Sequence, residues 1–214
     1  MMTLRHCHLF ALLVCILFCG CLGLPYDITS THAVRRLYYR KIDDFNKTIK
    51  LSDCKIKIKR VDVDYFGDKA FILAPYLKDM SPSIGDPMIF TRQHEFLYLN
   101  FANLRAVSLK EFPDPMTPEE KKAFIAKFSH LLWTGNVISG IKDIPKYKPG
   151  SLPAEVEKAI APPCYASDLI TVYTYTNLAG QVNRFRFAFT PEGKLKDIGR
   201  LEIAKDIGAF IYLL

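Results

Sequence analysis

The chain has 214 residues and a formal net charge of +7 at pH 7, and half of its residues are hydrophobic. This length allows one large domain or two small ones with a proper core. The positive charge favours acidic partners, and no stretch beyond residue 24 is long and apolar enough to be a membrane span, which excludes an integral membrane protein with spans in that region.

Residues 1–23 are predicted to be a secretory signal peptide. Arg5 precedes the uncharged run LFALLVCILFCGCLGL, which stops at Pro25 and is shorter than the roughly 20 residues of a membrane helix. Cleavage after Gly23 places small residues at the last and third-last positions of the leader, Gly23 and Cys21. We therefore expect residues 24–214 to form a protein that is secreted or lies in a secretory compartment, where nucleic acid is not an expected partner.

Two cysteines remain after this cleavage, Cys54 and Cys164. In an oxidising compartment they form either one disulfide or two separate buried thiols. A bridge over this separation would restrict the unfolded chain by about 4 to 5 kcal/mol. Asn46 in the triplet NKT is an acceptor for an N-linked glycan.

A first helix is predicted to begin at Ser30–Thr31, because apolar residues recur there every three to four positions; they are Val34, Leu37, Tyr38, Ile42 and Phe45. The tyrosine pair Tyr38–Tyr39 leaves a strand open as an alternative.

The next segment, DCKIKIKRVDVDYF, alternates apolar and charged residues. Ile56 and Ile58 share one strand face, and lysines occupy the other. The alternation slips by one residue at Arg60, so we expect either a bulged strand or two strands that meet at Lys59–Arg60.

Further strands are predicted over 69–77, 94–101 and 104–112, with a loop over 79–93. A capped helix follows. Thr117 suits the N-cap, Pro118 the first turn, Glu120 the capping box and Gly135 the C-terminal stop.

After a loop over 145–153 we expect a short helix over 154–161 and four strands over 169–176, 181–189, 194–203 and 208–214. The fold class is therefore α+β, with antiparallel sheet packed on a few helices. A helix followed by about four strands occurs twice. This pattern fits either two similar halves, 24–112 and 113–214, or a single sheet on helices.

The motifs indicate a protein without enzymatic activity, metal or cofactor. There is no Gly-x-Ser-x-Gly turn, and the residues around Cys164 match no thiol-protease signature. The histidines after residue 23 are scattered, without the spacing of a zinc site.

Two binding hypotheses follow. The first is a basic face for an anionic glycan, a lipid headgroup or an acidic protein, made by Arg35, Arg36, Arg40, Lys41, Lys55, Lys57 and Lys59. Its plain alternative is the solvated side of a sheet. The second hypothesis is a carrier of a small molecule or lipid, with a pocket lined by Tyr173, Tyr175, Phe185, Phe187, Phe189 and Phe210. The alternative is ordinary core packing, which is the more common role of aromatic residues at every second position of a strand.

Overall fold

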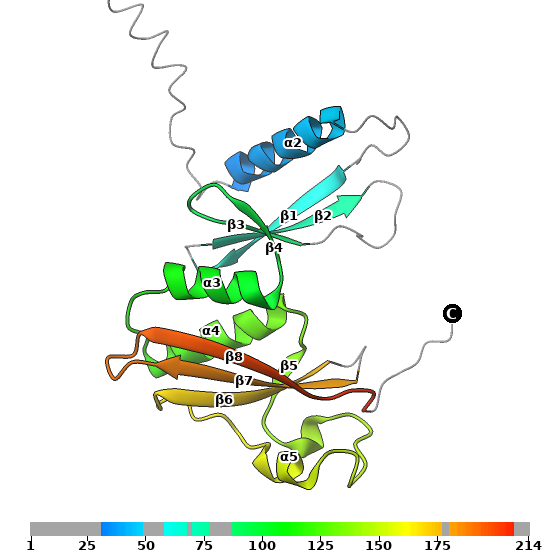
Figure 1. The fold of residues 1–214 in the computed structure, drawn as a ribbon, viewed down its shortest axis with the longest axis vertical. Coiled ribbons are helices and arrows are strands. Elements are labelled where there is room, and N and C mark those ends of the chain that lie inside the picture. Colours follow the sequence, from blue (N-terminus) through cyan, green and yellow to red (C-terminus); the bar gives the residue numbers. More distant parts are fainter. Residues whose placement is uncertain (1–30, 49–57, 68–69, 78–86, 177–179, 208–214) are drawn as a thin grey trace, which may run out of the picture. The chain divides into compact units, whose positions relative to one another are not determined.

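The computed structural model describes residues 31–48, 58–67, 70–77, 87–176 and 180–207 (Figure 1). The chain divides into two compact units, Met1–Ile56 and Lys57–Leu214. The predicted signal peptide, Cys54 and the predicted strand 208–214 lie outside the described residues. Among the described helices, none combines the length and the apolar composition that crossing a membrane requires.

In the first unit, helix α2 spans Thr31–Thr48. Val34 and Tyr38 lie one turn apart and are buried, while Arg36 and Arg40 are exposed. The predicted amphipathic helix is confirmed, and the alternative of a strand through the tyrosine pair is wrong.

The second unit contains two antiparallel sheets of four strands each. In the first sheet the strands follow in chain order, β1 Ile58–Phe66, β2 Ala70–Leu77, β3 Met88–Phe90 and β4 Phe96–Tyr98. The second sheet has the same simple order, β5 Asn136–Ile138, β6 Leu169–Thr176, β7 Gln181–Phe189 and β8 Leu195–Ala204. The predicted α+β class is confirmed. The division into halves 24–112 and 113–214 stays a prediction.

The predicted bulge is present in β1. Ile58 pairs with Leu77 and Arg60 pairs with Tyr76, so β1 contains one extra residue between these two pairs. The irregularity lies at the position where the alternation of the sequence slips. It lets β1 continue as one strand to Phe66, which is buried.

Two local predictions are wrong. Residues 88–90 form β3 rather than part of a loop. The segment predicted as a strand over 104–112 is helix α3, Phe101–Glu111, with Asn100 as its N-cap. Its buried positions include the polar residues Ser108 and Glu111, which hide the helical period from a reading of hydrophobic residues alone.

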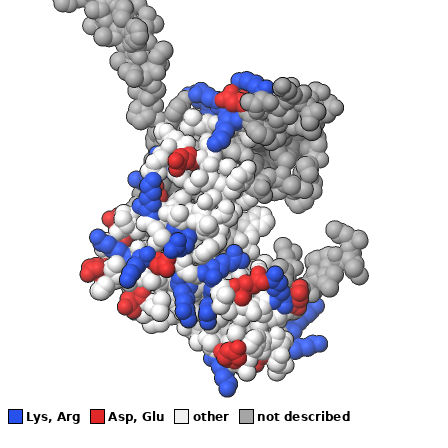
Figure 2. Space-filling view, in the orientation of Figure 1, with Lys and Arg blue, Asp and Glu red and all other residues white. Residues whose placement is uncertain are grey.

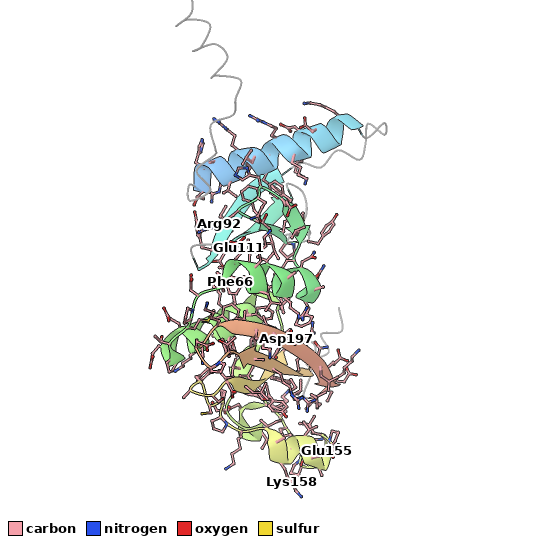
Figure 3. All side chains as sticks on the ribbon, turned by 60° about the vertical axis from the view of Figure 1, so that its left-hand side comes forward. Phe66, Arg92, Glu111, Glu155, Lys158 and Asp197 are labelled. Carbon is pink, nitrogen blue, oxygen red and sulfur yellow. The ribbon has the colours of Figure 1, made fainter. Side chains whose placement is uncertain are left out.

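Both polar side chains on the buried side of α3 have partners. The Ser108 hydroxyl donates to the carbonyl of Leu104 at 2.7 Å. The Glu111 carboxylate lies 3.7 Å from Nε of Arg92, and the two side chains are labelled side by side in Figure 3. These contacts allow the buried helix face to carry polar residues.

The remaining helices are α4 Pro118–Leu131, α5 Ala154–Ala159 and a short 3-10 turn, η2 Ile141–Asp143. The capping box predicted at Thr117 and Glu120 is confirmed: the Thr117 hydroxyl accepts from the Glu120 amide, and the Glu120 carboxylate accepts from the Thr117 amide at 2.8 Å.

Helices α3 and α4 lie between the two sheets of the second unit (Figure 1). One hydrophobic core joins these layers, with Phe66 from β1, Leu104 from α3, Phe128 from α4 and Phe185 from β7 among its members. Figure 3 shows Asp197 of β8, which bonds to Arg105 of α3 at 2.5 Å and so ties α3 to the second sheet. A second, smaller core lies on the other face of β6–β8, where Ile144 and Leu152 pack with Tyr173 and Tyr175.

Candidate functional site

The residues of the predicted basic face are only partly placed. Lys55 and Lys57 lie outside the described residues, Lys59 lies at the bulge of β1, and four members lie on α2, namely Arg35, Arg36, Arg40 and Lys41. With 3.6 residues per turn, Arg36 and Arg40 share a side of α2, while Arg35 and Lys41 project in other directions. Since α2 and β1 belong to different units, the basic face stays a prediction.

The predicted aromatic pocket is divided by the sheet itself. Val172 pairs with Phe185 and Tyr173 pairs with Arg184, so the phenylalanines of β7 and the tyrosines of β6 point to opposite faces. Phe185, Phe187 and Phe189 fill the main core, and Tyr173 and Tyr175 fill the smaller one. These five residues therefore do not line a common pocket, and Phe210 lies outside the described residues.

The predicted disulfide and the predicted glycosylation site both stay predictions. Cys164 is exposed in the segment before β6, but Cys54 is not described, so the disulfide stays a prediction. Asn46 lies in the last turn of α2, and its glycan also stays a prediction. Within the described ranges, no group of three or more His, Cys, Asp and Glu residues is arranged to hold a metal ion.

A groove of about 660 Å³ lies between the end of β1, the α3–α4 connection and the first turns of α4. We call it the aromatic groove. Its lining comes from two parts of the chain that are distant in sequence, 65–67 and 112–127, and consists of Tyr65, Phe66, Gly67, Phe112, Asp114, Pro115, Met116, Glu120, Ala123, Phe124 and Lys127.

Three phenylalanine rings lie together in the apolar part of this lining, which also includes Pro115, Met116 and Ala123. The ring centroids of Phe66 and Phe112 are 4.8 Å apart, those of Phe66 and Phe124 are 5.2 Å apart, and those of Phe112 and Phe124 are 5.1 Å apart. Aromatic pairs at these separations are favourable beyond the area they bury. Since Phe66 and Phe124 also belong to the main core, the aromatic groove is built on a rigid base.

Two glycines hold the walls of the groove in place. Gly67 ends β1 with φ +64°, and a Cβ there would approach the Phe112 ring to 3.1 Å. Gly193, in the β7–β8 turn, has φ +91° and accepts a hydrogen bond from the Met116 amide at 3.0 Å. A Cβ at Gly193 would lie 3.0 Å from the Met116 carbonyl oxygen, so this close approach requires glycine.

Charged side chains surround the apolar floor. Lys127 contacts Asp64 of β1 at 2.5 Å, which joins α4 to the first sheet. Glu120 has a pKa below its ordinary value, because its carboxylate accepts a hydrogen bond from the backbone of Thr117. Asp114 is exposed in the α3–α4 connection and also lines the groove. The lining thus holds two carboxylates and one ammonium group, and the ammonium group is paired with Asp64.

Few features of the sequence indicate this site. The predicted strand over 104–112 has Phe112 at its end, and the alternating segment DCKIKIKRVDVDYF ends at Phe66. The run FPDPM, which contributes four lining residues, marks a short proline-bounded connection between two elements. It does not show which strand end will lie beside it.

A second feature is a pair of arginines on the outer face of β7. Arg184 and Arg186 alternate with the buried phenylalanines and point away from the main core. Neither forms an ion pair with a carboxylate in the part of the chain that the structure describes. Lys and Arg side chains gather over the β6–β8 sheet with acidic side chains among them (Figure 2).

Comparison with known proteins gives no matching family model, no similar curated protein and no similar solved structure. The function must therefore be argued from the residues of the chain itself.

Proposed function

We propose that this chain is a secreted, non-enzymatic binding protein that holds a small, largely apolar ligand in the aromatic groove. The observation that carries the proposal is the set of three neighbouring phenylalanine rings that line a groove of about 660 Å³. Ligand sites are typically clefts of about 300 to 1,000 Å³ with mostly apolar linings and a few polar groups. The aromatic groove has this size and this composition.

The polar groups of the groove support binding rather than catalysis. A general acid at neutral pH needs a raised pKa, whereas the pKa of Glu120 is lowered by its role in the helix cap. Lys127 is engaged by Asp64. These groups are fixed in the structure and are suited to orient the polar end of a ligand.

The charges at the rim also predict which polar end is preferred. Glu120 lines the groove with a carboxylate whose pKa is lowered by the helix cap, and the ammonium group of Lys127 is neutralised by Asp64. A neutral or positively charged head group therefore meets a favourable field, and an anionic one meets repulsion. We expect an alkylammonium to compete for the groove better than an alkyl sulfate of the same chain length.

The test is a titration with the neutral fluorescent probe N-phenyl-1-naphthylamine. Ala123 is exposed on α4 and lines the groove, so Ala123→Phe adds a ring that fills it. We expect the variant to bind the probe at least about tenfold more weakly than the wild type, since the apolar contact area is lost.

Ala106 provides the matched control, because it is exposed on α3 and does not line the groove. Ala106→Phe adds the same ring to another exposed helix position, and its affinity should equal that of the wild type. Thermal melts show whether each variant is folded. Equal affinity of Ala123→Phe and wild type, or no binding by the wild type, would contradict the proposal.

A second candidate function is the binding of an anionic surface such as a sulfated glycan. The observation that favours it is the arginine pair on β7, which lacks carboxylate partners among the described residues. Two arginines two residues apart on one strand face stand about 7 Å apart, a separation that suits neighbouring anionic groups.

A further inference from the structure

Trp133, the single tryptophan of the sequence, is held in an exposed position after α4. Its side chain is 70% exposed and its φ is +58°, a conformation that is uncommon for a residue with a Cβ. Its amide donates to the carbonyl of His130 at 2.9 Å, and the hydroxyl of Thr134 donates to the carbonyl of Ser129 at 2.9 Å. The turn therefore holds the indole at the surface, although a large apolar ring of this kind is usually buried.

The indole lines a hollow of about 330 Å³, separate from the aromatic groove. Apolar side chains make up most of the lining and include Leu99, Phe101 and Leu132. Arg200 of β8 is the one charged residue in that lining. The hollow thus combines an apolar wall with an isolated positive charge.

Among the described residues, the guanidinium of Arg200 is held in position but forms no ion pair with a carboxylate, although its charge, after the larger effect of a hydrogen bond from Lys205, helps to lower the pKa of Glu202. Its Nε donates to the side-chain oxygen of Asn183 at 3.1 Å, and it lies 5.9 Å from the centre of the Phe185 ring. The nearest acidic neighbour in sequence, Glu202, is engaged by Lys205 at 3.0 Å and by Gln181. Two contacts therefore orient Arg200, while much of its donor capacity remains available.

The N-terminal end of α3 adds to the positive field. Asn100 and Phe101, where α3 begins, both line the hollow, and the first turn of α3 contains no acidic residue. A helix N-terminus has a partial positive charge. Arg200 and the N-terminal end of α3 therefore both make the electrostatic potential in the hollow more positive.

We infer that the hollow around Trp133 and Arg200 binds a small carboxylic acid with an aromatic or branched apolar body. Arg200 receives the carboxylate, because guanidinium and carboxylate match in charge and in bidentate geometry. Trp133, Leu99 and Leu132 contact the apolar body. This site is independent of the aromatic groove, whose rim disfavours anions.

Trp133 supplies the readout, since its emission is the tryptophan emission of the whole protein. We expect 3-phenylpropionate to shift the emission to shorter wavelength in a saturable titration, because the bound ligand shields the indole from water. The neutral 3-phenylpropionamide, equal in shape, should bind at least about tenfold more weakly, as should acetate, which lacks the apolar body.

Arg200→Met keeps an unbranched side-chain stem and removes the guanidinium with its charge. This variant should bind 3-phenylpropionate at least about tenfold more weakly than the wild type. Lys196→Met is the matched control, because Lys196 is an exposed cation on the same strand outside the hollow, and it should bind like the wild type. In addition, 3-phenylpropionate should not displace the naphthyl probe from the aromatic groove.

Equal affinity for the acid and the amide in the wild-type protein would overturn the inference, and this comparison does not depend on whether a variant folds. An absence of any saturable change in Trp133 emission would overturn it as well. Displacement of the naphthyl probe by 3-phenylpropionate would show that the acid binds in the aromatic groove instead.

Discussion

At the scale of single residues, the two buried tyrosines of β6 differ in what their hydroxyls contact. The Tyr175 hydroxyl donates to the carbonyl of Ile207 at 2.6 Å, and burial raises the pKa of this phenol. Tyr173 packs in the same smaller core, and its hydroxyl has no hydrogen-bond partner among the described residues. One hydroxyl therefore fastens the segment after β8 to β6, and the other does not.

This difference predicts a measurable contrast. Tyr175→Phe should lower the free energy of unfolding by about 1 kcal/mol, because a buried hydrogen bond is lost and the Ile207 carbonyl is left without this donor. Tyr173→Phe changes the same atoms without removing such a bond and should be close to neutral. Urea unfolding of both variants measures the contrast. Equal losses would show that the hydroxyl of Tyr175 contributes nothing specific.

At the scale of elements, the connection from α4 to β5 depends on one close approach. Gly135 has φ +85°, and a Cβ at this position would lie 1.8 Å from the carbonyl oxygen of Tyr175. Backbone rather than a movable side chain occupies that space. The turn that displays Trp133 therefore requires glycine for space as well as for its dihedral angle.

Gly135→Ala should accordingly lower the free energy of unfolding by about 3 kcal/mol or more. Gly150 is the control, since it also has a positive φ, +82°, but a Cβ there would have no neighbour within 4 Å. Gly150→Ala should cost only about 1 kcal/mol, the strain of a left-handed alanine. Thermal or urea unfolding compares the two. Similar losses of unfolding free energy in the two variants would mean that the β6 backbone at Tyr175 can move aside at little cost.

The elements also show what the sequence could predict. The bulge of β1 and the cap of α4 were predictable because each depends on neighbouring residues, the slip at Arg60 and the Thr117–Glu120 pair. Helix α3 was not, because its buried face contains Ser108 and Glu111, whose partners come from the tertiary structure. Its N-cap, Asn100, was a local signal that could have indicated the helix.

At the scale of the whole molecule, the α+β class was predictable from periodicity, but the layering of α3 and α4 between two sheets was not. The aromatic groove shows why. Phe66 and Phe124 meet across a long sequence separation, and nothing in either local pattern encodes that contact. The aromatic residues of β6 and β7 were recognisable, but their separation onto two faces follows from the strand register.

Because the net charge is +7, we expect the protein to bind polyanions in a salt-dependent way. We expect Arg184→Gln combined with Arg186→Gln to reduce binding of a sulfated oligosaccharide and to reduce its dependence on salt, because exposed charges are screened over about 8 Å at physiological ionic strength. Surface plasmon resonance at low and high salt measures both effects.

The three lysines predicted from sequence provide the comparison. If Lys55→Gln, Lys57→Gln and Lys59→Gln together remove the binding and the arginine variant does not, the anion site lies on the basic face predicted from the sequence. If neither set changes the affinity, both anion-binding hypotheses are wrong.

The measurement that tests the central claim most directly is native mass spectrometry, without reductant, on protein secreted from eukaryotic cells and incubated with the naphthyl probe. We predict that the wild type retains one small apolar ligand, either acquired during secretion or the probe, and that this mass leaves on denaturation. Under the same conditions a much smaller fraction of Ala123→Phe should carry the ligand. The denatured mass should also lack residues 1–23. The account would be contradicted if the wild type carried no ligand in the presence of excess probe, or if the wild type and Ala123→Phe carried the ligand to the same extent.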